Sequence, residues 1–361
     1  MKNLFIILSA LFFFLPLRAE INIVFDDSNM TAEVRSYSGA NDIEDLIIPE
    51  TVTFNGKTYS VTSIGSKAFY DCTGLKSIII PKTIKRIGDY AFGGCKNLEK
   101  VEISDLTAWC KIDFQGYEAN PTFYSNSLFL NGEEIIDLKI PDSINNIRSY
   151  SFTGLKHLKS VEIPNTIISI GTDAFDRCEE LTNIDFPNSL KKISSYAFGQ
   201  CKSLTCVTFP EFCSYLGAGA FSGCEGLKEI NFNTEDFLDL SSGVFYGCKS
   251  IEKIFCNSDF PIFCDYSDVF SDVTYKNAVL YVLKKNINFY KNNSPWHLFQ
   301  NLQALEDYPD VEGVDFILAE GQTVDVYSLN GLLVLRGASQ SDLDALRPGI
   351  YIIGGKKYVV K

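Results

Sequence analysis

Histidine, tryptophan and methionine are scarce in this chain of 361 residues, which holds two of each. The two histidines, His157 and His297, have no second histidine at a ligand spacing, and this argues against a zinc site. The sequence also lacks a phosphate-binding glycine loop, a dinucleotide fingerprint and a G-x-S-x-G nucleophile motif. We therefore expect no enzyme activity, no cofactor and no metal.

Positive charge is in deficit as well. Lysine and arginine number 32 against 45 acidic residues, for a net charge of −13. Such a surface repels nucleic acid and anionic lipid and favours solubility. We expect no nucleic acid partner.

Long uncharged runs are missing except at the start. Leu4 to Leu17 is a 14-residue stretch without charge between Lys2 and Arg18. It is too short to span a membrane as a helix, and it is typical of a secretory signal peptide over residues 1–19. Its removal takes the net charge from −13 to −15. An uncleaved anchor is the alternative.

What the chain does contain is a repeat marked by phenylalanine. The markers are Phe69, Phe92, Phe152, Phe175, Phe198, Phe221, Phe245 and Phe270. Four of the seven intervals are 23 residues, two are 24 and 25, and one of 60 leaves room for an irregular segment. A fixed period in the twenties predicts a solenoid of stacked units.

Cysteine follows the same period. Six of the eleven cysteines lie three residues after a marker: Cys72, Cys95, Cys178, Cys201, Cys224 and Cys248. Leu155 and Val273 take this place in two other repeats, so the slot suits a small buried apolar side chain. We expect reduced, buried thiols there, with disulfides between rungs as the alternative in an exported protein.

The unit itself predicts a strand. Residues 64–86 read IGSKAFYDCTGLKSIIIPKTIKR, and residues 170–192 read IGTDAFDRCEELTNIDFPNSLKK. The L-x-x-I-x-I part alternates apolar and polar positions like a strand with one buried face, and the following proline ends it. The Ile-Gly pair opens the return segment on the opposite side.

This A-F-x-x-C-x-x-L-x-x-I-x-I-P frame resembles the BspA-like leucine-rich repeats of bacterial surface proteins, from about Ile64 to Phe299. The resemblance implies a right-handed solenoid with a parallel β-sheet on one face. It also implies attachment to host matrix or cell-surface proteins, or to other bacteria.

Three further segments complete the organisation. Residues 20–63 predict an N-terminal β cap, with a turn at Asn55-Gly56. The leucine-rich-repeat solenoid spans 64–307 and contains an irregular insertion at 104–146 and a closing cap at 277–305. A linker then leads to a small C-terminal β-domain at 308–361.

The C-terminal segment carries the pattern V-x-V-Y-x-x-N-G…L-x-x-G-I-Y-I-I…K-x-V-V-K. This pattern resembles the C-terminal sorting tails of the type IX secretion system in Bacteroidetes. The resemblance implies export across the outer membrane, followed by cleavage or attachment at the surface. A passive C-terminal module is the alternative.

The outward strand positions are the first candidate binding face. One side chain per strand points away from the core, and stacked strands would align them about 5 Å apart. They are Ile79, Glu102, Glu162, Asp185, Thr208, Asn231 and Phe255. We expect either ordinary solvated residues or a docking face for a basic or mixed protein partner.

The aromatic insertion is the second candidate. Trp109 and Tyr117 either anchor a ligand or plug the stack, and plugging is the commoner role of aromatics in a non-repeating segment. The leading functional hypothesis is non-catalytic protein binding by an exported, surface-displayed protein. A cell-envelope scaffold and a glycan-binding component of nutrient capture are the alternatives; the latter needs Trp109 or Tyr117 to be exposed.

Overall fold

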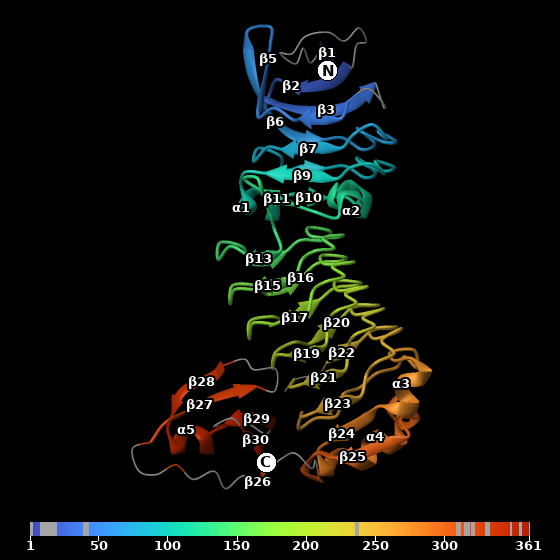
Figure 1. Cartoon of the computed structure of the whole chain (residues 1–361), viewed down its shortest axis with the longest axis vertical. Coiled ribbons are helices and arrows are strands. Elements are labelled where there is room, and N and C mark those ends of the chain that lie inside the picture. Colours follow the sequence, from blue (N-terminus) through green and yellow to red (C-terminus); the bar gives the residue numbers. More distant parts are fainter. Residues whose placement is uncertain are drawn as a thin grey trace.

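The computed structural model describes residues 3–7, 20–38, 43–234, 238–307, 312–313, 318, 322–328, 333–346, 349–353 and 356–360. Within them the repeats stack along one long axis, from the N-terminal cap to the closing cap (Figure 1). The predicted repeat solenoid is therefore confirmed.

A ladder of parallel strands forms one side of the solenoid, which we call the strand face. Each strand carries the L-x-x-I-x-I pattern or a variant of it, and its alternate apolar residues point into the core. The strands are β4 (Asp45–Ile47), β7 (Ser77–Ile80), β9 (Lys100–Ile103), β11 (Phe129–Leu130), β13 (Asp137–Lys139), β15 (Ser160–Glu162), β17 (Asn183–Ile184), β19 (Cys206–Phe209), β21 (Glu229–Phe232), β23 (Lys253–Cys256), β24 (Val279–Val282) and β25 (Asn301–Ala304). Because β4 pairs with β7, the ladder begins inside the segment assigned to the N-terminal cap.

A second series of short parallel strands forms the opposite side, which the sequence analysis described only as a return segment. The isoleucine of the Ile-Gly pair, or its equivalent, ends most of these strands. They are β6 (Lys57–Ile64), β8 (Arg86–Ile87), β10 (Asp113–Phe114), β14 (Asn146–Ile147), β16 (Ser169–Ile170), β18 (Lys192–Ile193), β20 (Tyr215–Leu216) and β22 (Asp239–Leu240).

The core lies between the two series. The marker rings of adjacent rungs stack, for example at 5.3 Å between Phe175 and Phe198 and 5.2 Å between Phe198 and Phe221. The six cysteines of the slot and Leu155 are buried as predicted, and all eleven cysteines are free thiols. The prediction is wrong for Val273, which is 38% exposed because it lies on α3 of the closing cap. Cys201 Sγ donates a hydrogen bond to the Phe175 carbonyl of the preceding rung at 3.4 Å. Burial raises the pKa of Cys95 to about 12, so this thiol stays protonated at neutral pH.

The caps follow the sequence closely. β2 (Glu20–Asp26), β3 (Thr31–Ser38) and β5 (Thr51–Phe54) build the N-terminal cap with β6. Asn55 and Gly56 both have positive φ in the β5–β6 turn, as do Asn131 and Gly132 between β11 and β12 (Glu133–Glu134). β1 (Asn3–Ile7) pairs with β2, and the rest of the predicted signal peptide lies outside the described residues.

Short helices fill the irregular parts. The insertion holds α1 (Leu106–Cys110), η1 (Tyr117–Ala119) and α2 (Thr122–Ser125). The closing cap holds α3 (Asp272–Asn277), η2 (Lys284–Asn286), α4 (Ile287–Asn292), η3 (Trp296–Leu298) and η4 (Leu305–Asp307). The insertion continues both ladders from the N-terminal side, because β10 pairs with β8 and β11 with β9. Both ladders break there, since new sheets begin at β13 and β14.

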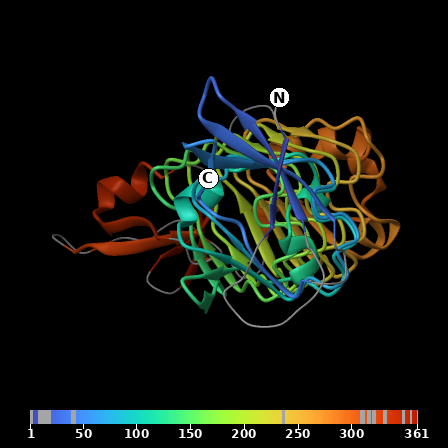
Figure 2. The same ribbon diagram turned by 90° about the horizontal axis from the view of Figure 1, so that it is seen from above.

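The C-terminal segment forms its own sheet. It contains β26 (Glu312–Gly313), β27 (Val324–Ser328), β28 (Leu333–Ala338), β29 (Gly349–Ile353) and β30 (Lys356–Val360), with α5 (Gln340–Asp344) beside them. The predicted C-terminal β-domain is present as this sheet, and residues 308–311, 314–317 and 329–332 lie outside the described residues. Figures 1 and 2 both place this sheet beside the last strands of the strand face.

Candidate functional site

The strand register brings the predicted outward residues into a row. Ile79 lies opposite Glu102, Thr208 opposite Asn231, and Asn231 opposite Phe255. Glu162 lies on β15, and Asp185 directly follows β17. Because adjacent strands are about 5 Å apart, members of the row on paired strands are immediate neighbours. Glu102 and Glu162 lie on different sheets and are not neighbours.

The register also adds residues that the sequence analysis missed. Ile47 lies opposite Ile79, Phe129 opposite Glu102, Lys139 opposite Glu162, and Tyr281 opposite Phe255. A signal was present, since Leu46-Ile47-Ile48-Pro49 and Leu138-Lys139-Ile140-Pro141 repeat the strand-then-proline pattern.

The N-terminal half of the row is open to solvent. We define this open half as Ile47, Ile79, Glu102, Phe129, Lys139 and Glu162. Ile47 and Ile79 are 58% and 38% exposed, although both are large apolar side chains. Beside them, Lys100 Nζ lies 2.6 Å from Glu102 and 4.8 Å from the centre of the Phe129 ring. Lys139 Nζ lies 2.7 Å from Glu162.

These ion pairs change the charge expected for the row. Glu102 and Glu162 are acidic in the sequence, but each carries a lysine partner. The Lys139–Glu162 pair is solvent-exposed and contributes little to stability, whereas the Glu102 side chain is 21% exposed. The open half therefore presents an apolar end and a charge-balanced centre, which suits a partner of mixed chemistry.

The C-terminal half of the row is covered, and here the prediction of outward exposure is wrong. Asn231 and Phe255 are each 1% exposed and Thr208 is 9% exposed. Phe255 stacks on Tyr281 at 5.0 Å, and both join Leu283 and Leu305 in an apolar cluster outside the solenoid core. Strand alternation predicts the direction of a side chain and says nothing of a second layer above it. The apolar character of Phe255 was the available signal for such a layer.

Trp109 and Tyr117, the two candidate residues of the insertion, also differ in exposure. Trp109 is 1% exposed, packs edge-on against Phe114 at 5.2 Å and donates a hydrogen bond to the Ser151 carbonyl at 2.9 Å. It plugs the stack and cannot act as a surface anchor. Tyr117 is 46% exposed, so it stays available to a ligand.

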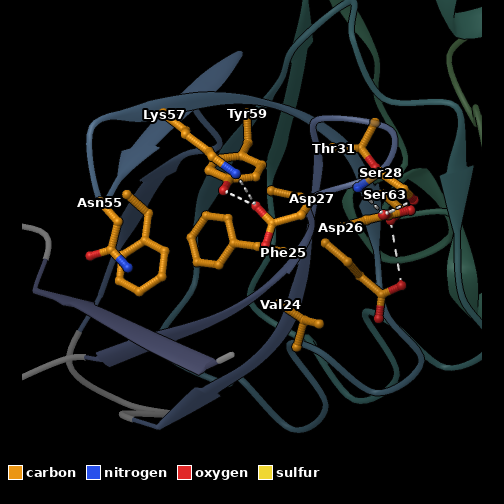
Figure 3. A pocket seen from close by; sticks show the side chains of 13 residues that line it. Val24, Phe25, Asp26, Asp27, Ser28, Thr31, Asn55, Lys57, Tyr59 and Ser63 are labelled. Atoms are coloured by element: carbon orange, nitrogen blue, oxygen red, sulfur yellow. Dashed lines mark hydrogen bonds and ion pairs between the residues drawn. The ribbon is translucent and has the colours of Figure 1, made fainter. Parts of the chain in front are cut away.

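A pocket of about 690 Å³ opens in the N-terminal cap, between the β2–β3 turn and the β5–β6 hairpin (Figure 3). Phe25 forms its apolar wall by stacking on Phe54 at 4.9 Å and meeting Tyr59 edge-on at 4.7 Å. Sequence reasoning did not predict this pocket, because its walls come from separate hairpins.

The carboxylates at the pocket rim are already engaged. Asp27 accepts hydrogen bonds from Lys57 at 3.0 Å and from Tyr59 at 2.6 Å. Asp26 accepts from Ser28 and Asn29, and these donors hold the pKa of Asp26 at about 2. An acid held ionised in this way is a poor proton donor at neutral pH. Across the described part of the chain, no three His, Cys, Asp or Glu residues are grouped to hold a metal ion.

Comparison with known proteins gives one family match. The model of the BspA type leucine rich repeat region matches in six copies, over residues 50–118 and 122–252. No curated protein matches the chain. Among the described helices, none has the length and apolar character needed to cross a membrane.

Several solved structures are similar at low identity. A leucine rich repeat protein of T. pallidum is 25% identical, over 64% of this chain and 87% of its own, with a TM-score of 0.37. A leucine rich cell surface protein from Faecalibacterium prausnitzii is 21% identical, over 79% and 93%, with a TM-score of 0.34. The pneumococcal vaccine antigen PcpA is 17% identical, over 80% and 95%, with a TM-score of 0.45.

Proposed function

The chain belongs to the BspA type leucine-rich-repeat family, whose model matches more than half of it. On this premise we propose that the protein is an exported, non-catalytic binding protein displayed on a bacterial surface. Leucine-rich-repeat proteins generally bind other proteins. The ligand in this proposal is a host matrix or cell-surface protein, held on the open half of the strand face.

One observation supports this site above the others. Ile47 and Ile79 are large apolar side chains that lie side by side in register and remain exposed. The ion pairs of Glu102 and Glu162 continue the row. An apolar patch with charged groups beside it is a common composition of a protein interface, and exposed apolar groups in register are otherwise a liability for solubility.

Export rests on the two ends of the sequence. The uncharged stretch in residues 1–19 is typical of a signal peptide, and residues 308–361 resemble a type IX sorting tail. Protease treatment of intact cells tests display: peptides from residues 64–300 should be shed while the cells stay whole. Protection of these peptides until lysis would instead favour a scaffold inside the envelope.

A substitution tests the binding face. Ile79→Asp places a charge at the apolar end of the row, and we expect at least a tenfold loss of affinity for a captured matrix protein, measured by biolayer interferometry. Ile168→Asp is the matched control, because Ile168 is 44% exposed and immediately precedes β16 on the opposite side. Equal losses from both substitutions would exclude the strand face as the binding site.

A further inference from the structure

Tyrosines recur at one place in successive rungs. Tyr90 and Tyr150 each lie two residues before a marker phenylalanine. In the irregular rung Ala119 takes the marker's place, because Phe92 N–H donates to the Glu118 carbonyl just as Phe69 N–H donates to the Ala91 carbonyl. Tyr117 therefore has the same position as Tyr90. The insertion stacks directly on the next rung, since Asn120 donates to the Tyr150 carbonyl at 2.7 Å.

The backbone does not favour tyrosine at this place. The Tyr150 ring is partly buried against the core, whereas Tyr90 and Tyr117 are exposed. Tyr90 has φ 54° and Tyr150 has φ 65°, a region that bulky residues rarely adopt. Gly219 and Gly243, two residues before later markers, have φ 63° and 64° without that cost. Tyr90 and Tyr117 are 39% and 46% exposed, so core packing does not account for their rings either.

The middle of this row is held in place by neighbouring groups. The Phe123 ring lies 5.0 Å from Tyr117 and 5.1 Å from Tyr124, and the Arg177 guanidinium lies 4.9 Å from the centre of the Phe123 ring. Tyr124 in turn donates to Glu118 and accepts from the Gly94 N–H. A surface whose rings are already fixed loses little entropy when a ligand binds.

Carboxylates surround the rings. Asp89 directly precedes Tyr90, and its Oδ1 lies 2.7 Å from the position that a Cβ atom on Gly116, the neighbour of Tyr117, would take. Glu118 lies next to Tyr117 in the chain, and its charge is the main cause of the raised pKa of Tyr117. Burial and then the charge of Asp173 raise the pKa of Tyr150. Arg177 is the positively charged side chain in contact with the platform. Hydrogen-bond acceptors therefore outnumber cationic groups here.

Flat rings and acceptors together fit a polyhydroxylated ligand. The C–H face of a sugar ring stacks on an aromatic ring, and its hydroxyls donate to carboxylates, which form the stronger hydrogen bonds. Successive rungs are about 5 Å apart, so rings carried on successive rungs suit a chain of sugars laid along the stack. The charges of Asp89 and Asp173 would repel an acidic polymer. The exposed apolar groups of this surface are aromatic, whereas those of the strand face are aliphatic.

We propose that Tyr90, Tyr117, Phe123 and Tyr150, with the flanking carboxylates of Asp89 and Asp173, form a binding site for a neutral polysaccharide chain. This aromatic platform is separate from the strand face, and it does not depend on the protein-binding role proposed there. The chain would then carry two binding surfaces on one solenoid.

Affinity gel electrophoresis of the full-length protein tests the site, with xylan, mannan and β-glucan as neutral probes and alginate as an acidic one. We expect at least one neutral polymer to retard the protein. Tyr117→Ala should weaken this retardation at least tenfold, whereas Tyr117→Phe should largely keep it. Tyr246→Ala should change nothing, because Tyr246 is 59% exposed but lies away from the platform.

Thermal unfolding of each variant separates lost binding from lost folding, and Phe123→Ala, which removes the support of Tyr117, gives a second test. Retardation by alginate alone, by no polymer, or equally by wild type and Tyr117→Ala would overturn the proposal. The proposal would also be overturned if Tyr117→Ala lost protein capture but kept glycan binding. Ile79→Asp should leave glycan retardation unchanged, so this proposal and the protein-binding proposal can fail separately.

Discussion

Ile79 and Phe255 hold the same outward position in two rungs of one solenoid, yet their surroundings differ completely. Ile79 is 38% exposed and Phe255 is 1% exposed. Each lies in register with its neighbours on a parallel ladder. The local sequence therefore decides which way a side chain points, and other parts of the chain decide whether water reaches it.

The two halves of the strand face differ in whether they can contact a partner. The open half can meet a partner without rearrangement, whereas Phe255 and Tyr281 already contribute to an apolar cluster with Leu283 and Leu305. The C-terminal sheet stands beside this covered half (Figure 2). A binding role for Thr208, Asn231 or Phe255 would require that cover to move first.

The largest expected effect comes from truncating the covered position. Phe255→Ala should lower the free energy of unfolding by about 3 to 5 kcal/mol, because it removes a buried ring and leaves a cavity. Ile79→Ala, at the open position, should change it by less than about 0.5 kcal/mol. Urea unfolding followed by circular dichroism measures both. Similar losses at the two sites would contradict the division into halves.

Asp176 has a partly buried carboxyl, and its substitution should change stability by an intermediate amount. Burial and then the nearby charge of Asp173 raise the pKa of Asp176 to about 7. The folded state thus binds this proton more tightly than the unfolded state, whose pKa is near 3.8. The resulting stabilisation is complete below about pH 4 and is lost as the pH rises through 7.

Asp176→Asn removes this titration. Relative to the wild type, the variant should gain roughly 1 to 3 kcal/mol of unfolding free energy between pH 4 and pH 8, after allowance for partial solvation. Glu252→Gln, at an exposed site, is the control. A constant difference between Asp176→Asn and the wild type across this range would show that Asp176 does not titrate as inferred.

The smallest effect belongs to the exposed ion pair of the open half. The side chains of Lys139 and Glu162 are 71% and 66% exposed, and their charged atoms lie 2.7 Å apart. A double-mutant cycle with Lys139→Ala and Glu162→Ala should give a coupling below about 0.5 kcal/mol, falling further in 0.5 M salt. A coupling above about 1 kcal/mol would mean that this half is less open than its exposure indicates.

Much of the fold could be predicted from the sequence, because each rung repeats the same local constraints. The marker phenylalanines, the six cysteines of the slot and the Asn55-Gly56 turn depend on short-range patterns, and they lie where the sequence analysis placed them. The second parallel ladder was harder to anticipate. Its strands are mostly two residues long, too short for periodicity to reveal them.

The candidate sites were predicted less well, since exposure depends on distant parts of the chain. Tyr117 was identified from the sequence, and its neighbour Phe123 lies in the same insertion. Arg177 comes from a later rung and reaches the Phe123 ring only because the rungs stack. Trp109 and Phe255 have the composition of surface anchors and are both buried. An irregular insertion also hid the equivalence of Tyr117 and Tyr90, because its rung lacks the marker phenylalanine.

The stacked marker rings have a consequence for how such a molecule changes length. Phe198 finds the same kind of partner on both sides, at 5.3 Å and 5.2 Å. Another 23-residue unit inserted beside it would meet the contacts that its neighbours already make. Duplicating or deleting whole units in the gene would thus extend or shorten the molecule by about 5 Å at a time. The contacts between the remaining rungs would stay the same.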